Sequence, residues 1–169
     1  MIDSKNISGA LGLVVLRIAQ AIEKGVANDA IIDQAARWID HTRILVSVKT
    51  LKYMVRGGRV SPLKGLLAKL LNLNPIVSMD TDGNSMVFGK TFSQNSNMKK
   101  VMAHINRTSR DRTIWNYIVL HANNRPAADW YARQMTALTA KAPVAAVNIS
   151  PVIGASAGLG AASVAFMFD

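Results

Sequence analysis

The segment with the most distinctive chemistry runs from Arg56 to Val60 and reads Arg-Gly-Gly-Arg-Val. Two adjacent glycines, Gly57 and Gly58, permit backbone angles and close approaches that other residues exclude. Arg59 carries a planar fork of N–H donors, which can hold a carboxylate or a phosphate in two places. A helix C-terminal cap followed by a surface arginine would produce the same residues. Both interpretations stay open, and the functional one makes Arg59 an anion contact.

A second glycine-rich segment extends from Gly154 to Gly160 and contains Ser156. We expect a loop between two buried strands, in which backbone amides and the Ser156 hydroxyl could form an anion-binding concavity. It is not a Walker loop, because no Lys-Ser or Lys-Thr follows, and it does not match the spaced glycines of a dinucleotide site. A plain tight connection between the strands explains the segment at least as well.

His121 is expected where a strand ends and a helix follows, so its ring could bond a ligand or a structural partner. The three histidines are not spaced as ligands on one element, and no pair of carboxylates suggests a metal site. The chain has no cysteine, and no serine lies in a Gly-x-Ser-x-Gly setting. We therefore expect neither enzymatic activity nor a metal or other cofactor.

A stripe of leucines follows Ser61-Pro62, which is a typical helix start. Leu63, Leu66 and Leu67 fall on one face at helical spacing. This face could contact an acyl chain or a membrane surface. Ordinary core packing is the commoner explanation for such a stripe.

Hydrophobic periodicity places helices and strands alternately along the chain, which predicts an α/β (α+β) fold with a mixed sheet flanked by helices. An Asp-Gly pair between two apolar runs predicts a β-hairpin. Expected helices cover residues 8–24, 28–41, 49–56, 97–108 and 126–139, and expected strands cover 42–48, 75–80, 85–90, 113–120, 144–149 and 161–168.

Composition limits the classes of function. Half of the 169 residues are hydrophobic and 18% are charged, so a packed core is expected. The net charge of +10 comes from scattered Lys and Arg residues without a reading motif, so we expect no nucleic-acid partner. Residues 142–168 carry no charge but contain three clustered glycines and a proline, which argues against a transmembrane segment. With no signal pattern at the N-terminus, a cytoplasmic location is expected.

Several segments, taken in order, resemble the DegV family of bacterial fatty-acid-binding proteins. The resemblance covers essentially the whole chain, and the order of the motifs is more specific than any one of them. It implies a C-terminal DegV-like domain over residues 42–169, with residues 1–41, a strand start and two helices, as a remnant of the N-terminal domain. The matching segments are residues 2–12, 49–53, 56–60, 73–77, 121–122 and 149–160.

The resemblance implies that a long-chain fatty acid lies between two domains and that, as in some members of the family, it is presented to a kinase partner. A kinase-like domain fused to the same protein is the other expected partner. The carrier itself would perform no chemistry. By matching, the resemblance places Arg59 near the head-group end or the partner surface, and His121 as the family's histidine after the strand. It makes Leu63, Leu66 and Leu67 contacts of the tunnel or of the core, and we expect Gly57, Gly58 and Ser156 to contact the ligand as well.

Three departures from the family pattern bear on that expectation. The segment that usually precedes Asp3, with the threonine and serine motifs that hold the carboxylate, is absent here, so a truncated domain is expected. Ser156 stands where histidine is common, and Phe92 where arginine is often found. A regulatory or interaction domain that binds no lipid is therefore the alternative. We also expect the first helix to expose apolar surface and to mediate self-association.

Overall fold

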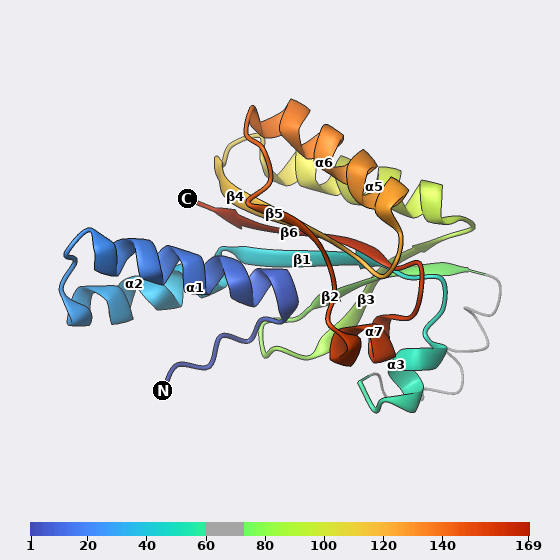
Figure 1. The fold of residues 1–169 in the computed structure, drawn as a ribbon, viewed down its shortest axis with the longest axis horizontal. Coiled ribbons are helices and arrows are strands. Elements are labelled where there is room, and N and C mark those ends of the chain that lie inside the picture. The colour runs from blue at the N-terminus through green and yellow to red at the C-terminus, as the bar shows by residue number, and fades with distance from the viewer. Residues whose placement is uncertain (60–72) are drawn as a thin grey trace.

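The computed structural model describes residues 1–59 and 73–169, so the leucine stripe at Leu63, Leu66 and Leu67 lies outside the described part. A mixed sheet with helices on both faces is present, as the sequence predicts (Figure 1). The helices are α1 (Ser8–Glu23), α2 (Asn28–Asp40), α3 (Lys52–Arg56), α5 (Gln94–Thr108), α6 (Arg125–Thr139) and α7 (Pro151–Ala157); the strands are β1 (Thr42–Ser47), β2 (Asn74–Met79), β3 (Ser85–Thr91), β4 (Ile114–His121), β5 (Ala145–Asn148) and β6 (Ala162–Phe168).

The sheet has the strand order β3-β2-β1-β6-β4-β5. Only β4 and β5 pair in parallel, and every other neighbouring pair is antiparallel. The predicted hairpin is confirmed as β2 and β3, with Gly83 in the turn at positive φ. The backbone N–H of Asn84 donates to the Asp80 carboxylate at 2.8 Å, and this bond lowers the pKa of that carboxyl.

Strand β6 lies in the middle of the sheet. Because it pairs with both β1 and β4, it joins two groups of strands.

Alternation along β6 divides the core between the two faces of the sheet. Val164 and Phe166 point to the face covered by α5 and α6, where they join the largest buried cluster. Ala165 and Met167 point to the opposite face and pack with α1 and α2. A third cluster around Val48 and α3 lies on this second face, so the space between the α1 side and the α3 side is where a cavity can form.

Helix α1 lies close against the sheet at its first turn. A Cβ atom at Gly9 would lie 2.8 Å from Leu120 Cδ1, so any larger residue here would force the Leu120 side chain to shift. Farther along, the Arg17 guanidinium lies over the Trp115 ring, 4.3 Å from its centroid, and pairs with the Asp169 carboxylate at 3.2 Å. The outward face of α1 exposes apolar side chains, namely Leu11, Val15 and Ile22. The strand start expected before α1 is not formed, because residues 1–7 pair with no strand.

The glycine-rich segment near the C-terminus differs from the prediction. Residues 151–157 form helix α7 rather than a loop, with Ser150 before the helix and Pro151 at its first position, a favoured arrangement. The segment does connect two strands, β5 and β6, and β4 lies between them in the sheet. No helix in the described ranges is both long and apolar enough to cross a membrane.

Candidate ligand-binding cavity

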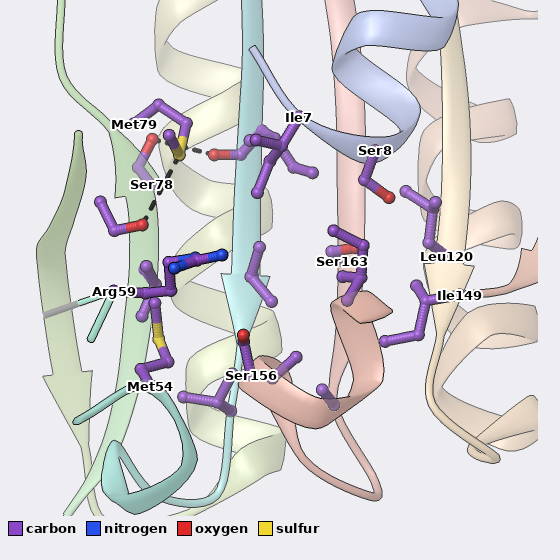
Figure 2. A pocket seen from close by; sticks show the side chains of 18 of the residues that line it. Ile7, Ser8, Met54, Arg59, Ser78, Met79, Leu120, Ile149, Ser156 and Ser163 are labelled. Atoms are coloured by element: carbon purple, nitrogen blue, oxygen red, sulfur yellow. Dashed lines mark hydrogen bonds between the residues drawn. The ribbon is translucent and has the colours of Figure 1, made fainter. Parts of the chain in front are cut away.

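A cavity of about 370 Å³ lies on the face of the sheet that carries α1, between the start of α1 and the pair α3 and α7 (Figure 2). Its volume falls within the range of about 300–1,000 Å³ that is typical of small-molecule sites. Most of its wall is aliphatic. The apolar side chains include Ile7, Ile44, Val46, Val48, Met54, Val77, Met79, Leu120, Ile149 and Ile153, and the polar or small contributors include Ser8, Gly58, Arg59, Ser78, Gly83, Asn84, Ser85, His121, Ser156 and Ser163.

The predicted Gly-Gly-Arg segment ends α3 and borders this cavity. The Arg59 backbone N–H donates to the Met54 carbonyl at 2.9 Å, and Gly58 has a positive φ of 66°, so the segment caps the helix. Arg59 also lines the cavity, and its Nη1 donates to the Gly57 carbonyl at 3.1 Å. The two interpretations of this segment are therefore compatible in one geometry, while ligand contact by Arg59 stays a prediction.

Ser156 reaches the cavity from α7, opposite the end of α3. The two helices pack closely, because a Cβ atom at Gly57 would lie 3.5 Å from Ser156 Oγ. After α7 the chain turns at Gly158, whose φ is 80° and ψ 159°, and its Cα faces the Tyr53 ring. A Cβ atom at Gly158 would lie 2.5 Å from Tyr53 Cδ2. Helices α3 and α7 thus form one wall of the cavity, and glycine is needed where they meet.

His121 is buried at the end of β4, as the sequence predicts, and contributes to the cavity lining. Its Nδ1 accepts a hydrogen bond from the Asn124 backbone N–H at 3.2 Å. Asn124 in turn accepts from the Ala127 backbone N–H and so caps α6. The ring therefore stabilises the turn between β4 and α6, and a role in ligand contact remains untested.

Two hydroxyl groups that sequence reasoning missed also face the cavity. Ser78 and Ser163 are both buried, on β2 and β6. The Ser78 hydroxyl donates to the Ile44 carbonyl at 2.9 Å, whereas the Ser163 hydroxyl has no hydrogen-bond partner among residues 1–59 and 73–169. Ser163 could have been noticed, because it is the only polar residue in the apolar run from Ala161 to Phe168.

The charge of the cavity lining is one-sided. Arg59 brings a permanent positive charge, and no aspartate or glutamate from residues 1–59 or 73–169 is among the lining residues. Apolar walls with a positive charge and without carboxylates suit an amphiphile that has an anionic head group. No cluster of three His, Asp or Glu side chains that could hold a metal ion occurs in the described ranges.

Comparison with known proteins places this geometry in context. A DegV domain-containing protein of Streptococcus pyogenes serotype M6 is 28% identical over 159 residues, which cover 94% of this chain and 56% of the relative. A DegV domain-containing protein of Staphylococcus aureus strain N315 is 29% identical over 123 residues, covering 73% of this chain and 44% of the relative. The chain thus spans about half the length of the curated relatives it matches.

Solved structures share the fold at low sequence identity. A fatty acid binding DegV family protein from Streptococcus agalactiae superposes with a TM-score of 0.88 at 20% identity, covering 99% of this chain and 59% of that one. The Streptococcus pneumoniae fatty acid kinase B3 protein, loaded with linoleic acid, gives a TM-score of 0.86 at 17% identity, covering 99% and 59%. The sequence model described as "Uncharacterised protein, DegV family" matches residues 1–169. This chain therefore belongs to the DegV family.

Proposed function

We propose that this chain binds a long-chain fatty acid in the cavity and serves as a carrier, not as an enzyme. The observation that carries the proposal is the cavity lining, in which the described residues combine aliphatic walls with a guanidinium and include no carboxylate. Each buried methylene contributes about 0.8 kcal/mol, so about ten of them contribute about 8 kcal/mol before the cost of association is subtracted. Family members described as fatty-acid-binding proteins support the same conclusion.

A cavity-filling substitution tests the proposal. Ala157 is half-buried and lines the cavity from α7, whereas Ala155 is exposed on the same helix. We expect Ala157→Phe to lower palmitate affinity at least tenfold because the ring takes space from the acyl chain, and we expect Ala155→Phe to leave it unchanged. Titration calorimetry and mass spectrometry of organic extracts measure both. A wild-type chain that binds no fatty acid would contradict the proposal.

We also propose that the bound acid is presented to a kinase partner, or to a kinase-like domain fused to the same protein. The relative described as a fatty acid kinase B3 protein supports this extension. Arg59 is exposed as well as lining the cavity, so its guanidinium is available to a partner as well as to the ligand. The same proposal includes a cytoplasmic location. It also includes a division at residue 41 between an N-terminal domain remnant and the C-terminal domain.

A second candidate is an interaction domain that binds no lipid. The apolar residues Leu11, Val15 and Ile22 on the outward face of α1 favour it, because a helix that is apolar on both faces is normally covered. Self-association through this face would cover it. Ser156, at a position where histidine is common in the family, favours the same candidate. Fatty acid that co-purifies at one equivalent per chain excludes this alternative.

A further inference from the structure

We infer that the acyl cavity continues into a second cavity beside it, and that this chain takes fatty acids with a hydroxyl group at the methyl end. The inference rests on the fatty-acid binding proposed above and names a substrate class within it. The second cavity has a volume of about 310 Å³. It is bounded by the end of α2, the start of β1, the end of β2 and the start of β3.

The two cavities share part of their walls. Ile44, Ser78 and Met79 line both of them. Figure 2 draws Ser78 and Met79 at one end of the first cavity, and Met54 and Ser156 at the other. Met79 is half-buried, and its unbranched side chain adapts readily to a neighbour. A rotation of this side chain therefore joins the two cavities for an acyl chain.

The second cavity exists because β1 and β2 separate. Their register pairs within the described ranges are two adjacent ones, Val46 with Val77 and Ser47 with Ile76. Beyond these pairs, the Ser78 hydroxyl donates to the Ile44 carbonyl at 2.9 Å and takes the place of a backbone donor. The start of β1 thus has no strand partner on this side in the described part of the chain, and unpaired backbone groups favour a polar partner.

The lining of the second cavity is polar and balanced in charge. Lys5 and Arg43 are its positive residues, and Asp40 and Asp80 are its negative ones. Uncharged polar side chains are also present, namely Asn6, Thr42, Ser78 and Thr81. In the first cavity, by contrast, the described residues bring the positive charge of Arg59 and no carboxylate. A carboxylate therefore belongs in the first cavity, and an uncharged polar group in the second.

A hydroxyl group finds both kinds of hydrogen-bond partner in the second cavity. Arg43 Nη1 donates to the Asp40 and Thr42 carbonyls at 2.6 and 2.8 Å, whereas its Nε and Nη2 form no hydrogen bond within residues 1–59 and 73–169. These donors are available to a hydroxyl oxygen, and the Asp80 carboxylate can accept the hydroxyl proton. A terminal methyl group would leave all of these groups without a ligand partner.

A matched pair of ligands tests the inference in the complete 169-residue chain. Palmitate and ω-hydroxypalmitate are titrated into the wild-type chain by calorimetry. We expect their affinities to agree within about threefold, because the hydroxyl exchanges water for partners in the protein. A hydroxyl buried in an apolar tunnel without a partner would instead weaken binding by roughly tenfold or more.

A matched pair of variants locates the hydroxyl. Met86 lines the second cavity from β3 and is 42% exposed, whereas Val147 on the other edge strand, β5, is 43% exposed and lines neither cavity. Met86→Trp should fill the second cavity and weaken ω-hydroxypalmitate about tenfold more than palmitate. Val147→Trp should leave the ratio of the two affinities at its wild-type value.

A measurement on the wild-type chain does not depend on any substitution. Methionine methyl groups labelled with ¹³C report contacts by nuclear magnetic resonance. The Met79 and Met86 signals should both shift with ω-hydroxypalmitate. Octanoate, which is half as long, should leave the Met86 signal unchanged, because it does not reach past Met79.

The outcomes separate this inference from the proposed function. A wild-type chain that binds neither acid overturns the proposed function, and the inference with it. Palmitate binding together with ω-hydroxypalmitate binding that is tenfold weaker overturns the inference alone. An affinity ratio that Met86→Trp changes no more than Val147→Trp does also overturns it, because the hydroxyl then lies outside the second cavity.

Discussion

Gly158→Ala tests whether α3 and α7 form a rigid wall of the cavity. Gly158 has φ 80° and ψ 159°, a region that essentially only glycine occupies and that costs other residues of order 1–3 kcal/mol. The added methyl group would also lie 2.5 Å from Tyr53 Cδ2 and 2.6 Å from Cε2, so the ring must move away. Together these effects should lower the free energy of unfolding by about 3 kcal/mol.

Urea denaturation measures this loss, and two further variants divide it into its causes. A decrease of about 3 kcal/mol moves the midpoint by about 1–2 M. Gly25→Ala is the control, because Gly25 also has a positive φ, 73°, but meets no atom within 4 Å. It should cost about 1 kcal/mol. In a Tyr53→Ala background the steric part should disappear, so that Gly158→Ala costs less there.

One result would refute the reasoning about the wall. If Gly158→Ala costs no more than Gly25→Ala, the contact between the turn after α7 and Tyr53 does not stabilise the protein. If the cost is unchanged in the Tyr53→Ala background, backbone strain alone explains it. Palmitate titration of the same variants then shows whether the wall matters for binding, with weaker binding expected for Gly158→Ala.

Three further predictions concern regions away from this wall. Arg17→Ala should lower the free energy of unfolding by about 1–2 kcal/mol in urea titrations because it removes the stacking on Trp115, and Arg17→Lys should recover only part of it. Val15→Lys should reduce self-association in sedimentation velocity, whereas Gln20→Lys on the same helix should not; a monomeric wild type would contradict the proposed contact. Burial, with the nearby charge of Arg107, lowers the pKa of His104. The folded state therefore binds a proton less readily than the unfolded state does, so the free energy of unfolding should fall as the pH drops below about 6.5. His104→Gln should flatten this dependence in urea titrations between pH 5 and 8, and an unchanged dependence would contradict it.

Elements with strong local signals could be predicted from the sequence. Helical spacing of apolar residues and the stop at Gly25 predicted α1, which runs from Ser8 to Glu23. The Asp82-Gly83 pair predicted the hairpin of β2 and β3, because few other residues accept the backbone angles of such a turn. The mixed sheet followed from strands and helices that alternate along the chain.

The prediction of a loop at the glycine-rich segment was wrong for a physical reason. Glycines at 154, 158 and 160 suggested a loop, yet Pro151 favours a helix start and the run to Ala157 is long enough for two turns. The pairing of β6 with β1 and β4 is a long-range property, and nothing in the local pattern of residues 162–168 shows which strands are its neighbours.

The candidate site was only partly predictable. Arg59 and Ser156 were singled out by residue type, and both line the cavity. Ser163 was missed, although it is the only polar residue between Ala161 and Phe168, because only the three-dimensional structure shows that it borders the cavity. The close packing of α1 on the sheet at Gly9 could not be predicted either, because it depends on the distance to Leu120, a residue far away in the chain.

The central place of β6 has a consequence for biosynthesis. This strand follows all the others in the chain, yet it connects β3-β2-β1 with β4-β5. As the polypeptide leaves the ribosome, the two partial sheets emerge first, with the edges of β1 and β4 unpaired. Unpaired edges attract other chains, so nascent molecules need protection by chaperones during this interval. Ribosome stalling before β6 has emerged should therefore yield chains that aggregate more readily than chains stalled after β6 has emerged.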